Sequence, residues 1–277
     1  MGRLGQFAAV WLLATLGTSG LAAAAVTAQD VRGGWETYVD GVEHIYELHV
    51  EGQKVTGAYC TVCSDAETVA FLDGVLEPDG VSFVVTHLRD DGSTDFRERV
   101  RATISDGHFI AKGERIGGGG AFQWTMNRDP RGPTPAAPPA PNAPPPQQYS
   151  TDPPGPWQAV TMAKVEGVWL SRPGPNKQYF LIRKYGKGYR GLACGPCSNP
   201  YTMGLIDDFR IEGDTLRFNI FHEDWGTGPL PYEHRAAARL RDNEMRMDMV
   251  QSNGPRLFSM TVLGPLAFKA THERAAP

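Results

Sequence analysis

Two pairs of cysteines with the same spacing are the residues of this chain best suited to chemistry. Cys60 and Cys63 stand in the segment CTVC, and Cys194 and Cys197 stand in CGPC. Two thiols at this spacing can form a disulfide, exchange electrons as a dithiol, or bind a metal ion such as zinc. Four cysteines allow several pairings, and the two local pairs are the simplest.

The context of the cysteines favours disulfides over redox catalysis. A redox-active pair needs a thiol of lowered pKa, which a helix N-terminus usually supplies. The residues after Cys197 show no helical periodicity, and CTVC lacks the Gly-Pro of CGPC. We therefore predict disulfides Cys60–Cys63 and Cys194–Cys197 that shape a loop, in a protein that is not an enzyme. A thiol–disulfide enzyme remains an alternative.

A histidine follows each cysteine pair at the end of a row of apolar residues. His87 continues the alternating row Val81, Phe83 and Val85, and His222 continues a matching row in the second half. Alternate positions of a strand face the same side, so both histidines should face inward at the last position of their strand.

Two interpretations of these histidines remain open. In the first, each is hydrogen-bonded to a loop carbonyl and closes the rim, which predicts neither metal nor cofactor. In the second, two thiolates, the histidine and a nearby carboxylate bind zinc. The zinc ligands would then be Cys60, Cys63 and His87 with Asp90 or Asp91, and Cys194, Cys197 and His222 with Glu223 or Asp224.

The two halves of the chain are copies of one unit. The segment from Val31 aligns without a gap with the segment from Val165, and the histidines align after one inserted residue. The matched pairs include Gly33 and Gly167, Trp35 and Trp169, Gly57 and Gly191, Cys60 and Cys194, Cys63 and Cys197, and His87 and His222. Two homologous domains, 29–128 and 159–277, are the expected organisation.

The segments outside the repeats have compositions of their own. Residues 1–28 combine Arg3, an apolar run and small residues, which is typical of a signal peptide cut after Ala28. This predicts a periplasmic or secreted protein with no membrane span after cleavage, in a compartment where disulfides persist. The proline-rich linker 129–158 cannot bury a core. At about 3.1 Å per residue, it could hold the domains several tens of ångströms apart.

Short runs of alternating apolar and polar residues predict a series of strands in each repeat. In the first repeat they lie near 33–39, 43–51, 53–60, 68–77, 80–88, 96–104, 107–115 and 121–127. Such a series favours an all-β fold of two tandem antiparallel up-and-down barrels over a two-sheet sandwich. The longer connections follow the odd-numbered strands and must share one end of the barrel, which also receives the cysteines and His87.

The first strand of each repeat resembles that of the lipocalin and avidin-like barrels of the calycin group. The residues that carry the resemblance are Gly33-Gly34-Trp35 and Gly167-Val168-Trp169. The resemblance implies a β-barrel in which Trp35 and Trp169 close one end and small ligands enter the other.

These patterns point to binding rather than catalysis. The net charge of −4 gives no footprint for nucleic acid. We expect a small molecule or an envelope component to bind at the CxxC/His end of each barrel. The alternatives are a structural or interaction module of the cell envelope, and a metal-site or thiol–disulfide enzyme. The expected binding residues are His87, Asp90, Asp91, His222, Glu223, Asp224, Trp225, Tyr232 and His234.

The remaining histidines carry weaker expectations. His44 could face inward beside Tyr46, although Gln178 stands at the corresponding position of the second repeat. The histidines expected to be exposed to solvent are His49, His108, His234 and His272.

Overall fold

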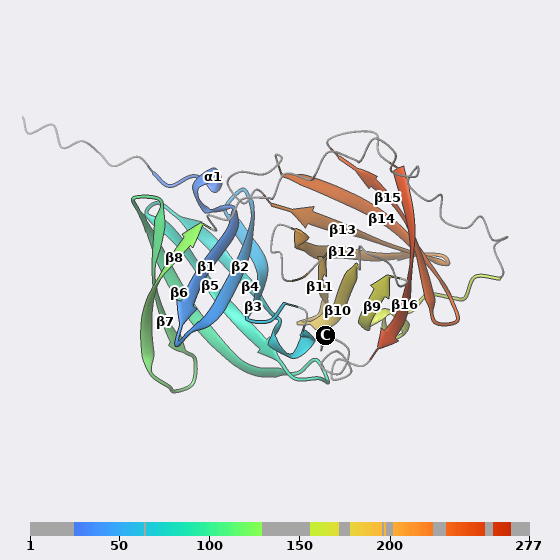
Figure 1. Ribbon diagram of the computed structural model, residues 1–277, viewed down its shortest axis with the longest axis horizontal. Coiled ribbons are helices and arrows are strands. Elements are labelled where there is room, and N and C mark those ends of the chain that lie inside the picture. The colour runs from blue at the N-terminus through green and yellow to red at the C-terminus, as the bar shows by residue number, and fades with distance from the viewer. Residues whose placement is uncertain are drawn as a thin grey trace, which may run out of the picture.

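The chain folds into two closed antiparallel β-barrels, as the computed structural model shows (Figure 1). The residues that the structure describes are 25–63, 65–128, 156–171, 178–195, 197, 202–223, 231–252 and 257–266. The predicted fold class, two tandem up-and-down barrels, is confirmed. No helix in these ranges has the length and apolar character needed to cross a membrane.

The first barrel is a meander in which each strand pairs with the next and β8 returns to β1. Its strands are β1 (Gly33–Val39), β2 (Val42–Glu51), β3 (Lys54–Cys60), β4 (Ala70–Glu77), β5 (Gly80–Leu88), β6 (Thr94–Ser105), β7 (His108–Arg115) and β8 (Ala121–Arg128). All the predicted strands are present. β4 begins later than predicted because Ala66–Thr68 forms a 3-10 turn, η1, in which the Asp65 side chain accepts a hydrogen bond from the N–H of Glu67.

The second barrel repeats this order, and β9 closes it between β10 and β16. Its strands are β9 (Gly167–Ser171), β10 (Tyr179–Tyr185), β11 (Gly188–Cys194), β12 (Gly204–Glu212), β13 (Thr215–His222), β14 (Tyr232–Arg241), β15 (Glu244–Gln251) and β16 (Leu257–Leu266). In both barrels the first strand starts at the end that we call the helix end. The connections that follow odd-numbered strands lie at the opposite end, which we call the long-loop end.

A short helix and a buried tryptophan lie at the helix end of each barrel. α1 (Ala28–Val31) precedes β1, and α2 (Met162–Val165) precedes β9. The indole N–H of Trp35 donates to the carbonyl of Val31 at 2.8 Å, and that of Trp169 donates to the carbonyl of Val165 at 2.7 Å. Both side chains are 1% exposed. The same local hydrogen bond therefore fixes the first strand of each barrel.

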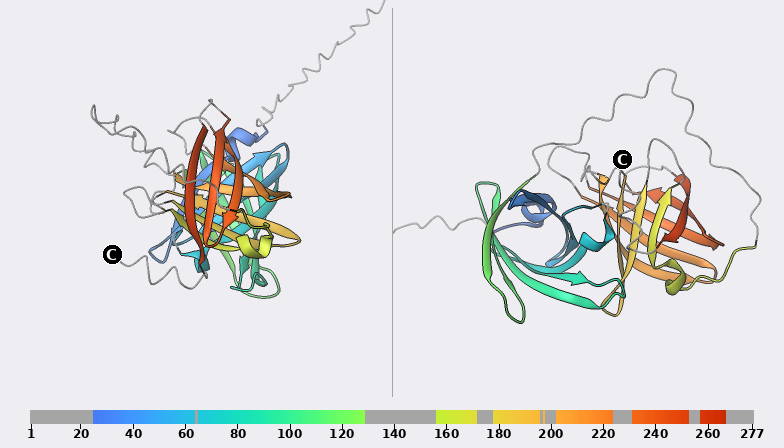
Figure 2. Two further views of the ribbon diagram at one scale, coloured as in Figure 1. Left: turned by 90° about the vertical axis from the view of Figure 1, so that its right-hand side faces the viewer. Right: turned by 60° about the horizontal axis from the view of Figure 1, so that its bottom comes forward.

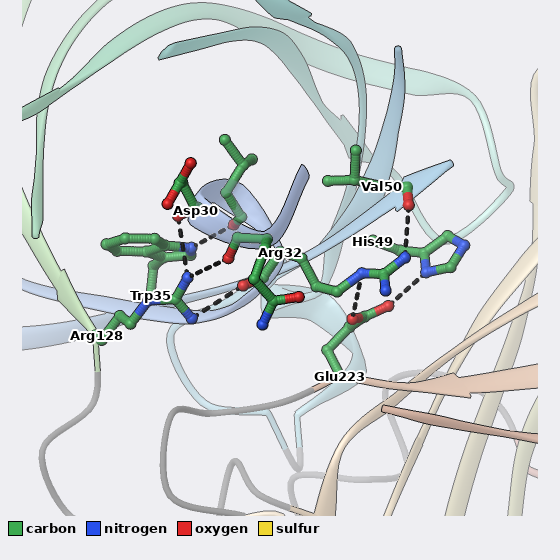
Figure 3. A network of polar contacts seen from close by, with 9 residues as sticks. Asp30, Arg32, Trp35, His49, Val50, Arg128 and Glu223 are labelled. Carbon is green, nitrogen blue, oxygen red and sulfur yellow. Dashed lines mark hydrogen bonds and ion pairs between the residues drawn. The ribbon is translucent and has the colours of Figure 1, made fainter. Parts of the chain in front are cut away.

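The two helix ends differ in what covers the tryptophan. The Arg128 guanidinium lies 4.7 Å from the ring centroid of Trp35, and donates to the carbonyls of Gln29, Asp30 and Arg32 (Figure 3). In the second barrel Gly264 packs on Trp169, and an added Cβ would lie 3.1 Å from the indole. One barrel thus uses a cation on the ring, whereas the other uses close backbone contact.

The two barrels pack against each other through a shared apolar cluster (Figures 1 and 2). It combines outward-facing residues of β2–β4 with the corresponding residues of β10–β12, including Ala58 and Leu192, and Phe71 and Leu205. The linker is long enough to hold the domains tens of ångströms apart, but burial of this cluster keeps the barrels together. The linker itself lies outside the described residues.

Polar contacts fix the orientation of one barrel on the other. Arg183, which is fully buried, donates to the carbonyls of Ala66 (3.1 Å) and Arg89, both at the long-loop end of the first barrel. In return, Glu223 at the long-loop end of the second barrel pairs with Arg32 (3.2 Å) and His49 of the first (Figure 3). Each long-loop end is thus held by side chains of the other barrel.

Candidate functional site at the long-loop end of the first barrel

Four polar side chains from four strands converge on the interior of the first barrel at its long-loop end. They are His44 on β2, Tyr59 on β3, His87 on β5 and Glu98 on β6. Each continues the row of side chains that fills the barrel, because alternate positions of a strand share a face. The buried members of this interior include Tyr46, Leu48, Val55, Phe83, Val85 and Val100.

The four side chains form a continuous chain of contacts. The hydroxyl of Tyr59 and Nδ1 of His44 are hydrogen-bonded at 2.8 Å. The ring of Tyr59 meets the edge of the His87 ring, with centroids 5.4 Å apart. Nε2 of His87 lies 3.4 Å from a carboxylate oxygen of Glu98. His44, which sequence analysis left as a weak expectation, therefore belongs to the site.

Further aromatic rings lie in the same barrel, and one of them contacts this polar chain. His87 stacks on Phe96 with a centroid distance of 4.0 Å. On β8, Phe122 and Trp124 stack on each other at 4.8 Å. Gly113 on β7 makes room for them, since an added Cβ would lie 2.2 Å from Phe122. The long-loop end therefore presents flat apolar surfaces together with a few hydrogen-bonding groups.

Three groups at this end are accessible or have no partner within the described residues. The buried indole N–H of Trp124 has no hydrogen-bond acceptor there. The side chains of His87 and Glu98 are 18% and 24% exposed, so solvent reaches them. A buried donor without a partner costs free energy, and a ligand that brings an acceptor would remove that cost.

The barrel closes through a short seam between β1 and β8. β1 and β8 pair through Trp35–Arg128 and Glu36–Asn127, both close to the helix end. Toward the long-loop end, the rest of β1 and the first part of β8 have no register with each other. Val39 and Val42 at this rim are 40% and 48% exposed. Within the described residues, the seam that closes the first barrel is thus short, and the rim at its long-loop end carries exposed apolar residues.

Burial changes the protonation of the side chains in this region. It raises the pKa of the Tyr46 and Tyr59 hydroxyls, and the negative charge of Glu98 raises both further. Burial lowers the pKa of His44, an effect that Glu98 partly offsets. At neutral pH the two tyrosines are protonated and His44 is neutral, so the carboxylate of Glu98 is the charge that the neighbouring groups sense.

The corresponding end of the second barrel has the same framework with different charges. His222, Tyr232 and His234 occupy the positions of His87, Phe96 and Glu98. Tyr232 stacks on His222 at 4.6 Å, and His234 meets His222 edge-on at 5.0 Å. Burial lowers the pKa of His222 to about 3, with a further contribution from His234. A neutral histidine pair thus replaces the histidine and carboxylate of the first barrel.

The His222 side chain matches the rim interpretation of the sequence. Its Nδ1 lies 2.9 Å from the carbonyl oxygen of Met203, which directly precedes β12. Its counterpart His87 contacts Glu98 instead. The prediction that His49 and His234 are exposed to solvent is wrong. His49 lies in the contact between the barrels, and His234 is half-buried against Tyr232.

The cysteines and histidines are not brought together. Both disulfides are formed, with Cα–Cα distances of 5.1 and 5.2 Å. Cys60 faces the inter-barrel cluster, whereas its neighbour Tyr59 faces the barrel interior with His87. The two sets lie at the same end but on opposite sides of the wall, since neighbouring strand residues alternate. Within the described residues, no three Cys, His, Asp or Glu side chains are grouped to hold a metal ion.

The other predicted binding residues lie apart from this site. Asp90 and Asp91 are on an exposed turn, where hydrogen bonds from the side chain and the backbone N–H of Ser93 lower the pKa of Asp91. Glu223 is buried and turned toward Arg32 and His49. Asp224 and Trp225 lie outside the described residues.

Sequence analysis missed several residues of the site. Tyr59, Phe96, Glu98 and Trp124 were not expected to take part. The signal that could have found them is the inward row of each strand: Phe96 and Glu98 precede Val100 at alternate positions, just as His87 follows Val85.

Comparison with known proteins assigns no family to the chain. No family model, no curated protein and no solved structure matches it. What the barrels do must therefore be argued from the geometry described above.

Proposed function

We propose that the protein is an exported, non-enzymatic binding protein whose first barrel takes a small molecule at its long-loop end. The observation that carries this proposal is the convergence of aromatic rings and a few polar groups inside the barrel at its long-loop end. Small-molecule sites in proteins are mostly apolar and aromatic, with a small number of polar groups that orient the ligand.

The chemistry of the site favours binding over catalysis. The raised pKa of Tyr59 keeps its hydroxyl protonated, which makes it a poor base at neutral pH. The disulfides hold the cysteines on the far side of the wall from His87. A protein that bridges two distant partners is less well supported, because the barrels contact each other directly.

The proposal also covers the location of the protein and the fold family that it resembles. The signal-like residues 1–28 and the local disulfides fit a periplasmic or secreted protein. The likeness to lipocalin and avidin-like barrels is also part of the proposal. It is supported by the tryptophan at the helix end of each barrel and by the meander of strands.

A neutral fluorescent probe tests the binding site. We expect N-phenyl-1-naphthylamine to bind the full chain saturably, with increased fluorescence, because apolar rings exclude water from it. Trp124→Ala should weaken this binding about tenfold, equivalent to about 1.4 kcal/mol. Met260→Ala, the matched change in the second barrel, should leave it unchanged.

Two outcomes of this experiment would contradict the proposal. Absence of saturable binding would contradict it, as would an equal loss of affinity in both variants. Near-identical circular dichroism and urea midpoints for the two variants would exclude unfolding as the cause.

A further inference from the structure

Glu98 is a carboxylate in an aromatic setting. It faces the barrel interior, and its contact within the described residues is His87 at 3.4 Å. In those residues, no lysine or arginine lies within ion-pair distance of it, although the exposed acidic groups of the same barrel, such as Glu114 and Asp95, have arginine partners. A carboxylate shielded by rings gains more from an opposite charge than one in open water.

The rings beside Glu98 are suited to a cation. Aromatic faces attract ammonium and guanidinium groups, and cages of such rings recognise alkylated ammonium ions. The protein already demonstrates this at Phe96: the guanidinium carbon of Arg115 lies 3.8 Å from its ring centroid. Arg115 is the cross-strand neighbour of Glu98 in the β6–β7 register, yet it rests on the ring and forms no ion pair with the carboxylate.

Glu98 therefore supplies a negative charge, and the ring of Phe96 supplies a surface that accepts a cation. One face of Phe96 is covered by His87, and Arg115 occupies a ring position that a ligand could compete for. The charge of Glu98 reaches the interior, where it raises the pKa of Tyr46 and Tyr59. A positively charged ligand group that took the place of Arg115 among these rings would meet the carboxylate of Glu98, which forms no ion pair with a lysine or arginine in the described residues.

The second barrel supplies an internal comparison. His234 stands where the first barrel has Glu98, and the pKa of His234 is lowered by burial, so it is neutral at pH 7. The aromatic framework is kept through Tyr232 and His222. The carboxylate is thus the feature that distinguishes the first barrel from the second.

We propose that the ligand of the first barrel carries a positively charged ammonium group, which Glu98 and the rings of Tyr59 and Phe96 recognise. This inference rests on the proposed function and names the chemical class of ligand for the same site. Arg115 acts as a built-in competitor on Phe96, and the ligand displaces it.

The experiment compares three probes of similar size on the full chain. Phenyltrimethylammonium is cationic, tert-butylbenzene is its neutral isostere, and benzenesulfonate is anionic. Each is titrated against bound N-phenyl-1-naphthylamine, and displacement is followed by fluorescence. We expect the ammonium probe to bind at least about tenfold more tightly than the neutral isostere, and benzenesulfonate to bind most weakly.

Two variants of opposite sign sharpen the test. Glu98→Gln should abolish the preference for the ammonium probe while leaving the affinity for tert-butylbenzene unchanged. Arg115→Gln should increase the affinity for the ammonium probe, because it removes the competitor. His234→Gln, the control at the matched position of the second barrel, should change neither affinity.

The outcomes separate this inference from the proposed function. If the naphthylamine and tert-butylbenzene bind but the wild type shows no preference for the ammonium probe, the inference is wrong and the binding site stands. If no probe binds, both are wrong. A preference that persists in Glu98→Gln would also overturn the role of the carboxylate. The wild-type comparison alone remains decisive if a variant does not fold.

Discussion

The two barrels share one framework and differ in the charges placed on it. Trp35 and Trp169 lie at equivalent places with the same hydrogen bond to the preceding helix. At the opposite end, Glu98 of the first barrel corresponds to His234 of the second. The tertiary framework thus survived duplication, whereas the side chains that would face a ligand diverged. On the proposal made above, this difference would make the first barrel, and not the second, the one that binds a cationic ligand.

The inter-barrel contact shows a second difference at matched positions. Arg183 corresponds to His49, and each reaches the long-loop end of the other barrel. Arg183 binds two main-chain carbonyls of the first barrel, whereas His49 binds the side chain of Glu223. The first barrel's loops are therefore held through the backbone, which fixes their shape independently of sequence.

Removal of Arg183 should have the largest effect on stability. Arg183→Ala leaves the carbonyls of Ala66 and Arg89 without their donor in a buried contact, so we expect a loss of about 3 kcal/mol in the free energy of unfolding. The measurement is urea-induced unfolding. The control is Arg217→Ala, whose exposed ion pair with Glu212 should be worth about 1 kcal/mol or less. Equal losses in the two variants would contradict the role of Arg183.

A smaller effect of opposite sign is expected at Glu47. This side chain is fully buried in the contact between the barrels, and the corresponding residue of the second barrel is Leu181, also buried. Burial raises the pKa of Glu47 well above its ordinary value, and the charge of Glu223 raises it further. Glu47→Leu should therefore stabilise the protein at neutral pH by about 1 kcal/mol or more, since it removes a buried ionisable group.

The pH dependence at Glu47 has a defined sign. The folded state holds the Glu47 proton more tightly than the unfolded state, so its contribution to stability is present below the ordinary glutamate pKa and is lost as pH rises toward the raised value. Urea unfolding across this pH range should show a decline in wild type that is reduced in Glu47→Leu. An unchanged profile in the variant would show that Glu47 does not control it.

Much of the fold follows from the sequence, because the repeat and the alternating rows are local patterns. The strands of the first barrel, the two barrels and the local disulfides were all predicted from them. The sequence analysis did not predict that Cys60 faces outward from the barrel. The aromatic side chain of Tyr59, the residue before it, suggests an inward position for Tyr59 and hence an outward one for Cys60. Glu98 was missed because it stands between Arg97 and Arg99, where a charged segment gives no sign that one member faces inward.

The contact between the barrels could not be predicted for a different reason. It depends on matching outward faces of β2–β4 and β10–β12, which are far apart in sequence and joined by a proline-rich segment that alone suggests separation. Arg183 and Glu47 look like ordinary surface residues of a strand until the second barrel covers them.

One measurement tests the central claim that the first barrel binds a ligand at its long-loop end. The full chain is labelled with fluorotryptophan, its fluorine NMR resonances are assigned by Trp124→Phe and Trp169→Phe, and N-phenyl-1-naphthylamine is titrated in. We predict a saturable shift of the Trp124 resonance and no shift at Trp169, because Trp124 borders the site and Trp169 lies at the helix end of the other barrel. A Trp124 resonance that stays fixed at saturating probe would contradict the account.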